Sequence, residues 1–275
     1  METSTNRNYK DSVFTSLFGE KETLLELYNA IKNTNYGKDT EIQITTLENV
    51  LYMEQMNDIS FTIDGKIVVL IEHQSTINPN MPLRMLLYIA RTYERITKRD
   101  DLYRQSKMTI PRPEFIVLYN GTDEYPDEQT LNLSDMFAQY GEKSPIQLEL
   151  TVKVYNINKG HNPDFAKRSE NLDGYEQFIA AVRDYENQGM DRENAITQAV
   201  KDCINRNVLK KFLELNGSEV VNMLLTEWNM KDALRVRENE KAEEIARNML
   251  NMGIDVDTIA KATGLFVDDV LRLKY

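Results

Sequence analysis

Apolar residues recur at helical spacing across segment 11–32, and this pattern predicts a helix that Gly19 interrupts. Three strand-like runs follow, at Glu41–Leu47, Asp58–Ile63 and Lys66–Ser75. In the second run apolar and polar residues alternate, as on a strand with two unlike faces. The third contains a continuous apolar run, which is typical of a strand buried on both sides.

The Asp64-Gly65 pair between the last two runs is a strong hairpin signal. Its loop length decides which residues face each other, because a shift of one residue turns every side chain to the other face. A strict two-residue loop turns Asp58 away from Glu72. A three-residue loop, which pairs Ile63 with Ile67, or a bulge sets the two acids opposite each other.

The rest of the chain alternates helix and strand before it becomes purely helical. Pro82 suits the first turn of a helix over Leu83–Lys98. Further strands are expected at Phe115–Tyr119 and Gln147–Ile157, and from Leu172 onward the pattern indicates helices only. The order predicts an α/β fold, a mixed β-sheet core flanked by helices, followed by an all-helical C-terminal region.

The helical region shows several separate patterns. They cover 172–188, 191–206, 207–215, 219–228 and, in three short pieces broken at Gly253 and Gly264, 241–274. The last segment has helix-turn-helix spacing. Because its second helix opens with Asp268 and Asp269, a packing or oligomer-forming tail is favoured over one that reads DNA. The predicted domains are a core over 1–170, a helical extension over 171–240 and a tail over 241–275.

Composition restricts the class of protein. The formal net charge is −11 and the sequence pI is about 4.9, which argues against a general nucleic-acid-coating protein. No run of about 18 apolar residues predicts a membrane span. The single Cys203 excludes an internal disulfide and a Cys-based zinc site, and favours a reducing, cytoplasmic setting.

One window reverses the acidic balance. Residues 84–112 contain eight Lys and Arg side chains against three acidic ones, a net of +5. This window is either the solvated face of a helix or a local contact for phosphates.

The candidate chemistry lies on the predicted hairpin. Glu72 and Gln74 project to the same face of one strand, and Asp58 lies on the partner strand. Two carboxylates at a sheet end can bind Mg²⁺, which prefers oxygen ligands and keeps several waters. Arg84 and Tyr88, four residues apart on a helix, share one face; Arg84 is either a phosphate contact or a snorkelling surface arginine.

The two histidines have structural interpretations. His73 lies on the strand face opposite Glu72 and Gln74, which favours a hydrogen-bonded structural histidine. His161, in the sequence Gly160-His161-Asn162-Pro163, is expected in a turn.

A set of motifs together resembles one known family. The motifs are Lys10-Asp11-Ser12-Val13-Phe14, Asn57-Asp58, Glu72-His73-Gln74-Ser75, Asn80-Met81-Pro82-Leu83-Arg84, Phe115–Gly121 and Val154–Asn158. Over most of its length the chain resembles the Rpn family of recombination-promoting nucleases, also labelled putative transposases. That family is a branch of the PD-(D/E)XK nuclease superfamily, so the resemblance implies a restriction-endonuclease-like core.

The resemblance also implies an activity. It predicts an endonuclease that cuts DNA, depends on Mg²⁺ or Mn²⁺ and is associated with recombination or mobile elements. Asp58 and Glu72 would bind the metal, and Gln74 occupies the place of the superfamily's Lys, where it can only orient a water. Arg84 is the candidate to supply the positive charge that this Lys would provide. Asp11 would contribute from the first helix or serve as its N-cap.

Two further interpretations remain open. The missing Lys and the acidic charge are compatible with a catalytically inactive, nuclease-derived DNA-binding or assembly protein. The helical C-terminal region is also a candidate surface for a homo-oligomer, which would place two sites on opposite DNA strands.

Overall fold

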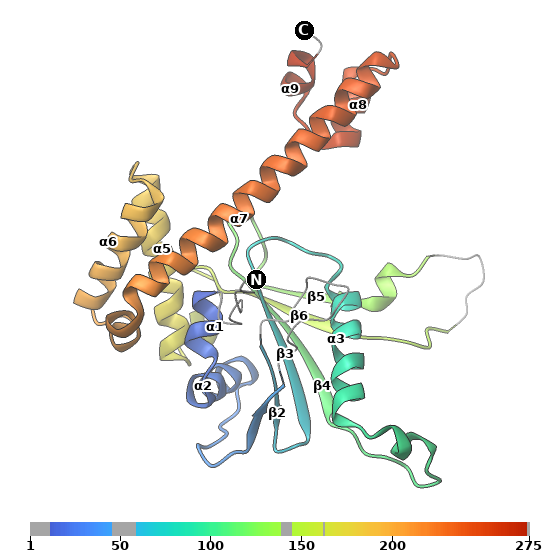
Figure 1. Ribbon diagram of the computed structural model, residues 1–275, viewed down its shortest axis with the longest axis vertical. Coiled ribbons are helices and arrows are strands. Elements are labelled where there is room, and N and C mark those ends of the chain that lie inside the picture. The colour runs from blue at the N-terminus through green and yellow to red at the C-terminus, as the bar shows by residue number, and fades with distance from the viewer. Residues whose placement is uncertain (1–11, 46–58, 139–144, 162, 274–275) are drawn as a thin grey trace, which may run out of the picture. The chain divides into compact units, whose positions relative to one another are not determined.

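The computed structural model describes residues 12–45, 59–138, 145–161 and 163–273. The chain divides into two compact units, Met1–Gly217 and Ser218–Tyr275. In the described part of the first unit, six strands form one sheet in the order β1-β2-β3-β4-β6-β5 (Figure 1). The strands are β1 (Ile42–Ile44), β2 (Ile59–Ile63), β3 (Ile67–Gln74), β4 (Arg112–Tyr119), β5 (Glu128–Asn132) and β6 (Thr151–Asn156).

The three central strands are parallel. β3 pairs with β4, and β4 pairs with β6, all in the same direction, whereas β1, β2 and β5 run antiparallel to their neighbours. The carboxyl ends of β3, β4 and β6 therefore meet at one edge of the sheet. Val68, Val69, Leu70 and Ile71 of β3 are all buried, as expected for a strand covered on both faces.

Helices cover both faces of this sheet (Figure 1). On one face, α3 (Met81–Ile96) packs its Met85 and Tyr88 against Val68, Leu70 and Val117. On the other lie α1 (Val13–Phe18), α2 (Lys21–Lys32) and α5 (Glu170–Asn187), and α6 (Arg192–Asn205) packs on α5. Shorter elements are η1 (Arg99–Tyr103), η2 (Leu133–Met136) and α4 (Pro163–Ala166). This mixed α/β architecture is consistent with a restriction-endonuclease-like fold, as the sequence predicted.

The β2–β3 hairpin has the register of the three-residue loop. Ile63 pairs with Ile67, and Ile59 pairs with Ile71 at the far end of the described pairing. Asp64 and Gly65 both adopt left-handed backbone, with φ of 49° and 62°. An aspartate followed by a glycine tolerates this conformation better than most residue pairs, which is why the turn forms here. The alternative two-residue loop is thereby excluded.

The second unit is helical throughout its described residues. It contains most of α7 (Lys210–Asn251), within which the boundary between the units falls, together with α8 (Val256–Thr263) and α9 (Val267–Arg272). Ala246, Ile259 and Val270 form its small core, one from each helix. The predicted breaks are confirmed: Gly253 and Gly264 lie between the helices with positive φ, the conformation that ends a helix at little cost for glycine.

The predicted division of the helical region between 207 and 251 was wrong. The helices expected at 219–228 and at the start of 241–274, and most of the one expected at 207–215, belong to one 42-residue helix, α7, which begins at Lys210. Gly217 lies inside this helix, which it weakens by about 1 kcal/mol relative to alanine. A Cβ at this position would lie 3.3 Å from the Val200 side chain, so the glycine allows α7 to pack closely on α6. Strand β5 was not predicted, since its sequence is mostly polar and it pairs only with β6 at the sheet edge. Of the helices in the described ranges, none is long and apolar enough to cross a membrane.

The single cysteine is inert in this fold. Cys203 lies on α6 and its side chain is fully buried. Burial raises the pKa of its thiol to about 11, so the thiol stays protonated at neutral pH. A protonated, inaccessible thiol is a poor nucleophile and a poor metal ligand.

Candidate functional site

Glu72 and Gln74 lie at the carboxyl end of β3, on the sheet face that α3 covers. Both continue the alternation of Val68 and Leu70, which are buried under that helix. The Glu72 side chain is only 4% exposed, whereas Gln74 is half-buried. A buried carboxylate at a strand end is costly to fold unless a cation or hydrogen bonds compensate it, so its partners indicate its function.

Arg84 is the cation beside Glu72. Its Nη2 lies 3.2 Å from Glu72 Oε2 and donates to Tyr88 Oη at 3.0 Å. The guanidinium carbon also lies 5.8 Å from the centre of the Tyr88 ring, a cation–π distance. Because Arg84 and Tyr88 are one helical turn apart on α3, the helix carries both to the acid on β3. The predicted common face is confirmed.

The sulfur of Met81, the first residue of α3, contacts side chains from both β3 and α3. Gln74 Nε2 donates to Met81 Sδ at 2.8 Å, and Arg84 Nη1 approaches the same sulfur at 3.4 Å. A thioether is a weak acceptor, so these contacts position the amide and guanidinium without binding them tightly. Glu72, Gln74, Arg84 and Tyr88 thus form one cluster, which we call the β3–α3 cluster.

The other two predicted site residues, Asp58 and Asp11, lie outside the described residues. Within the described ranges, no group of three His, Cys, Asp or Glu side chains is arranged to hold a metal ion. The Glu72 carboxylate and the Gln74 amide offer oxygen atoms of the kind that Mg²⁺ prefers. The described residues therefore fit part of a divalent-metal ligand set, and a second carboxylate is needed to complete it.

An arginine that the sequence did not single out ties together the neighbouring strand ends. Arg183 of α5 donates to Asn158 Oδ1 at 2.6 Å and to both the backbone and side-chain oxygens of Asn120, at 2.7 and 2.8 Å. Burial lowers the pKa of its guanidinium, but the arginine stays charged. Nothing in the helical pattern around Arg183 distinguishes it, because its partners Asn120 and Asn158 come from the segments that follow β4 and β6. These residues fix the edge at which the β3–α3 cluster lies.

Gly121 provides a test of how tightly that edge is packed. A Cβ at this position would clash with the Ser75 carbonyl oxygen and the Tyr119 hydroxyl. We therefore expect Gly121→Ala to lower the free energy of unfolding by about 1–3 kcal/mol, as overpacking does elsewhere. Urea denaturation would measure this. Gly37→Ala is the matched control, since a Cβ there meets nothing within 4 Å, and an equal loss in both variants would contradict the tight packing.

The histidines take up structural positions. His73 stacks on Phe14, with ring centroids 4.6 Å apart, and its Nε2 lies 3.1 Å from Tyr175 Oη. These contacts are on the face opposite Glu72, as predicted for a hydrogen-bonded structural histidine. His161 closes a turn, as predicted, since its backbone N–H donates to the carbonyl oxygen of Asn158; its Nδ1 lies 2.6 Å from Asp127 Oδ1.

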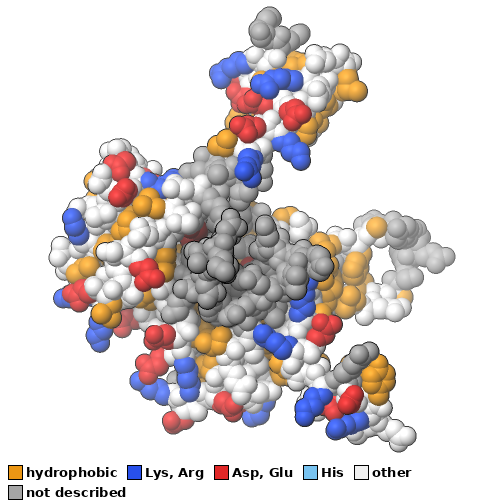
Figure 2. Space-filling model, in the orientation of Figure 1, with side chains coloured by type: hydrophobic (Ala, Val, Ile, Leu, Met, Phe, Trp, Pro, Cys, Tyr) orange, Lys and Arg blue, Asp and Glu red, His pale blue; other side chains and the backbone are white. Residues whose placement is uncertain are grey.

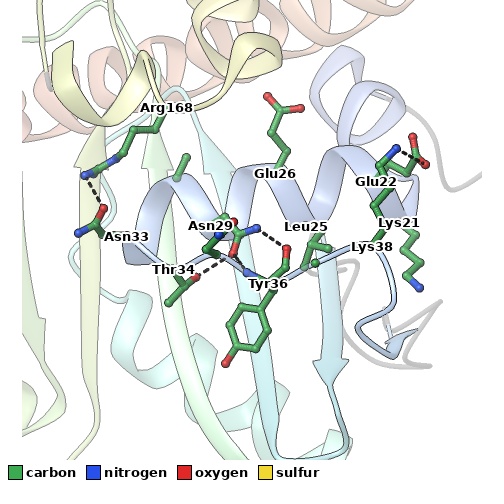
Figure 3. Close-up of a pocket in the computed structure, with 13 residues that line it drawn as sticks. Lys21, Glu22, Leu25, Glu26, Asn29, Asn33, Thr34, Tyr36, Lys38 and Arg168 are labelled. Atoms are coloured by element: carbon green, nitrogen blue, oxygen red, sulfur yellow. Dashed lines mark hydrogen bonds and ion pairs between the residues drawn. The ribbon is translucent and has the colours of Figure 1, made fainter.

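A surface pocket of about 700 Å³ lies away from the β3–α3 cluster, between α2 and the loop that follows it (Figure 3). Several of its polar side chains hold this loop in place. Asn29 binds Tyr36 through both halves of its amide, Lys38 pairs with Glu22 at 3.5 Å, and Arg168 donates to the loop's first residue. The pocket contains none of the predicted site residues.

Comparison with known families gives two matches. Residues 11–165 match a model described as putative transposase, YhgA-like. Residues 239–274 match a model described as the C-terminal HTH domain of the Rpn/YhgA-like nuclease family. No curated protein and no solved structure matches the chain. The first match contains Glu72, Gln74, Arg84 and Tyr88, and the second contains α8 and α9.

Proposed function

Because the chain belongs to the family of YhgA-like putative transposases, we propose that it is a metal-dependent DNA endonuclease that hydrolyses phosphodiester bonds. Its setting would be recombination or the movement of mobile elements, in keeping with the family's description. The helix-turn-helix match at the C-terminus supports DNA as the partner.

The observation that carries this proposal is the β3–α3 cluster together with the hairpin register. The pairing of Ile63 with Ile67 is the register that the metal-site hypothesis requires. The cluster then adds a buried carboxylate, an amide and a cation at one sheet edge. Open α/β sheets commonly bind ligands outside the carboxyl ends of their strands, which is where these side chains lie.

In this proposal Glu72 and Asp58 bind Mg²⁺ or Mn²⁺. The chemistry that such an ion supplies is a water of lowered pKa and neutralisation of charge on the phosphoryl oxygens. Gln74 orients the attacking water through its amide. Arg84 contacts a non-bridging phosphate oxygen, to which its planar guanidinium can donate two hydrogen bonds.

The reaction forms one bond from the water oxygen to phosphorus and breaks one phosphorus–oxygen ester bond, whose oxygen takes up a proton. Gln74 cannot supply positive charge in this step, as a lysine would. Arg84 can supply it, since its guanidinium already lies 3.2 Å from Glu72. The guanidinium would exchange part of its contact with Glu72 for the phosphate when DNA binds.

Plasmid cleavage tests this function. We expect the purified chain to nick or linearise supercoiled plasmid with Mg²⁺, and EDTA to stop the reaction. Asp58→Ala is expected to abolish cutting, because one of two charged ligands is lost. Equal cutting by both proteins would show that a contaminant or another site is responsible.

A second candidate function is that of a non-catalytic DNA-binding or assembly protein. It is favoured by the Glu72–Arg84 ion pair, which compensates the acid without a metal, and by glutamine in the lysine position. This candidate predicts salt-sensitive DNA binding without strand scission in Mg²⁺ or Mn²⁺. Metal-dependent nicking that Glu72→Ala removes would eliminate it.

We also infer that the tail, α8 and α9, has a role in DNA binding or self-association. The helix-turn-helix match supports the first, whereas Asp268 and Asp269 in the first turn of α9 oppose phosphates and support the second. Analytical ultracentrifugation with and without DNA separates these roles: a monomer mass in both conditions would count against the homo-oligomer.

A further inference from the structure

Three arginines form a row along one side of α3. Arg84, Arg91 and Arg95 are separated by seven and four residues, so at 3.6 residues per turn they lie within an arc of about 40°. Tyr88 lies in the same row. Arg84 places one end of the row at Glu72, and at the other end Arg95 donates to the backbone carbonyl of Thr45, just after β1. The row therefore runs from the β3–α3 cluster along the β2 and β1 side of the sheet.

The arginines of the basic window, residues 84–112, differ in whether a nearby carboxylate neutralises their charge. Arg84, Arg104 and Arg112 each pair with a carboxylate, at 3.2, 2.9 and 3.0 Å. Within the described ranges, neither Arg91 nor Arg95 forms an ion pair with an acidic side chain. These two are the members of the row whose charge no described carboxylate offsets.

Arg91 adds a second sign that the row has an external ligand. Its Nη1 is buried and makes no hydrogen bond within the described part of the chain. A buried donor of a charged group that lacks a partner costs free energy in the folded state. In a chain of net charge −11, such an uncompensated cation is suited to an anionic ligand brought from outside.

We propose that Arg91 and Arg95, in line with Arg84, are a track for the sugar-phosphate backbone of DNA that leads to the β3–α3 cluster. This inference rests on the proposed function and extends it, because it assigns DNA contacts beyond the reacting phosphate. The track explains how an acidic chain binds DNA at one local surface. It also fixes the direction of the bound backbone, along α3 from the strand ends toward β1.

The dimensions of the row suit this partner. At a rise of about 1.5 Å per residue, Arg84 and Arg95 are separated by about 16 Å along the helix axis. One DNA strand carries a phosphate about every 3.4 Å along its axis, so a duplex beside α3 presents several phosphates over that length. An arginine of the row can donate to one of them through the guanidinium nitrogens that face the duplex.

The test is a binding experiment without cleavage. Fluorescence anisotropy of a labelled duplex, in EDTA and over a series of NaCl concentrations, gives the Kd and its salt dependence for the full chain. We expect Arg91→Gln and Arg95→Gln each to weaken binding by about tenfold or somewhat less. Each should also lower the slope of log K against log salt by about one, as the loss of one phosphate contact does.

Two matched variants control this test. Arg104→Gln removes a cation of the same basic window. Arg104 lies just after η1 in the segment that connects α3 to β4, which we call the extension. In Figure 2 that extension stands at the lower right, with cationic, acidic and hydrophobic side chains. Arg104 already pairs with Asp101, so its loss should leave the salt slope unchanged. Arg91→Lys keeps the charge and should keep the slope, even if the partly buried position makes Arg91→Gln unstable. Arg95 is exposed, so its substitution avoids that problem.

The outcomes separate the track from the proposed nuclease activity. If Arg95→Gln or Arg91→Gln has the wild-type slope, or if Arg104→Gln lowers the slope equally, the track is wrong even though plasmid is cut. If plasmid is never cut but both arginines still control binding, the track stands and the nuclease function fails. Polyglutamate that competes as well as unlabelled DNA would assign the row to an acidic protein partner instead, and absence of any DNA binding would also overturn the track.

Discussion

Glu72→Gln is expected to reduce Mg²⁺-dependent plasmid cleavage by about a hundredfold or more. The substitution keeps the size of the side chain but removes the charge of a carboxylate that would bind the metal. Stabilisation of transition-state charge by a metal is worth several kcal/mol, and each 1.4 kcal/mol corresponds to a factor of ten in rate. Initial rates of supercoiled plasmid loss, measured over a range of Mg²⁺ concentrations, would determine the effect.

The same substitution should not weaken DNA binding in EDTA, since it removes a negative charge beside Arg84. This separates a catalytic role for Glu72 from a loss of folding or of DNA contact. Glu94→Gln, which changes an exposed acid on α3, the helix that carries Arg84, is the matched control and should cut at the wild-type rate. Wild-type cleavage by Glu72→Gln would refute the assignment of this carboxylate.

Arg84→Gln is expected to lower the free energy of unfolding by about 2–4 kcal/mol at neutral pH. The variant loses the ion pair with the almost fully buried Glu72, the hydrogen bond to Tyr88 and the cation–π contact. Removal of one partner from a buried pair is far more costly than loss of a surface pair, because the other charge stays in the interior. Urea denaturation of the full chain, followed by circular dichroism, would measure the change.

A double-mutant cycle isolates the pair. In the Glu72→Gln background, Arg84→Gln should cost less by about 1–3 kcal/mol, which is the usual coupling energy of groups in direct contact. A coupling near zero would mean that the contact contributes nothing to stability. Arg206→Gln, at a more exposed pair with Asp202, provides the comparison and should change stability by about 1 kcal/mol or less.

Part of the candidate site could be predicted from the local sequence. Glu72 and Gln74 could be assigned to one strand face because the period of a strand is two residues. Arg84 and Tyr88 could be assigned to one helix face for the analogous reason. Their meeting could not be derived, because it depends on which sheet face α3 covers and on the position of α3 along β3. Arg183 was missed since its partners lie just after β4 and β6, far from it in sequence.

The uncompensated arginines illustrate the same limit. All members of the basic window were visible in the sequence, and the spacing of Arg84, Arg91 and Arg95 is a property of the helix alone. Whether a cation has a nearby carboxylate depends on contacts such as Arg104 with Asp101 or Arg112 with Glu114. These pairs distinguish Arg84, Arg104 and Arg112 from Arg91 and Arg95, which have no described carboxylate partner.

The sequence by itself determined the class of the fold, the elements with strong periodicity, the break at Gly19 and the two helix ends at Gly253 and Gly264. These depend on the alternation of apolar residues and on local backbone preference, which act over a few neighbours. The tertiary structure alone decided the hairpin register, the continuity of α7 through Gly217 and the pairing of Glu72 with Arg84. The continuity of α7 and the Glu72–Arg84 pair depend on packing between segments that are apart in sequence. The register depends on how β2 and β3 pair around the left-handed turn at Asp64 and Gly65, which the sequence left open between two loop lengths.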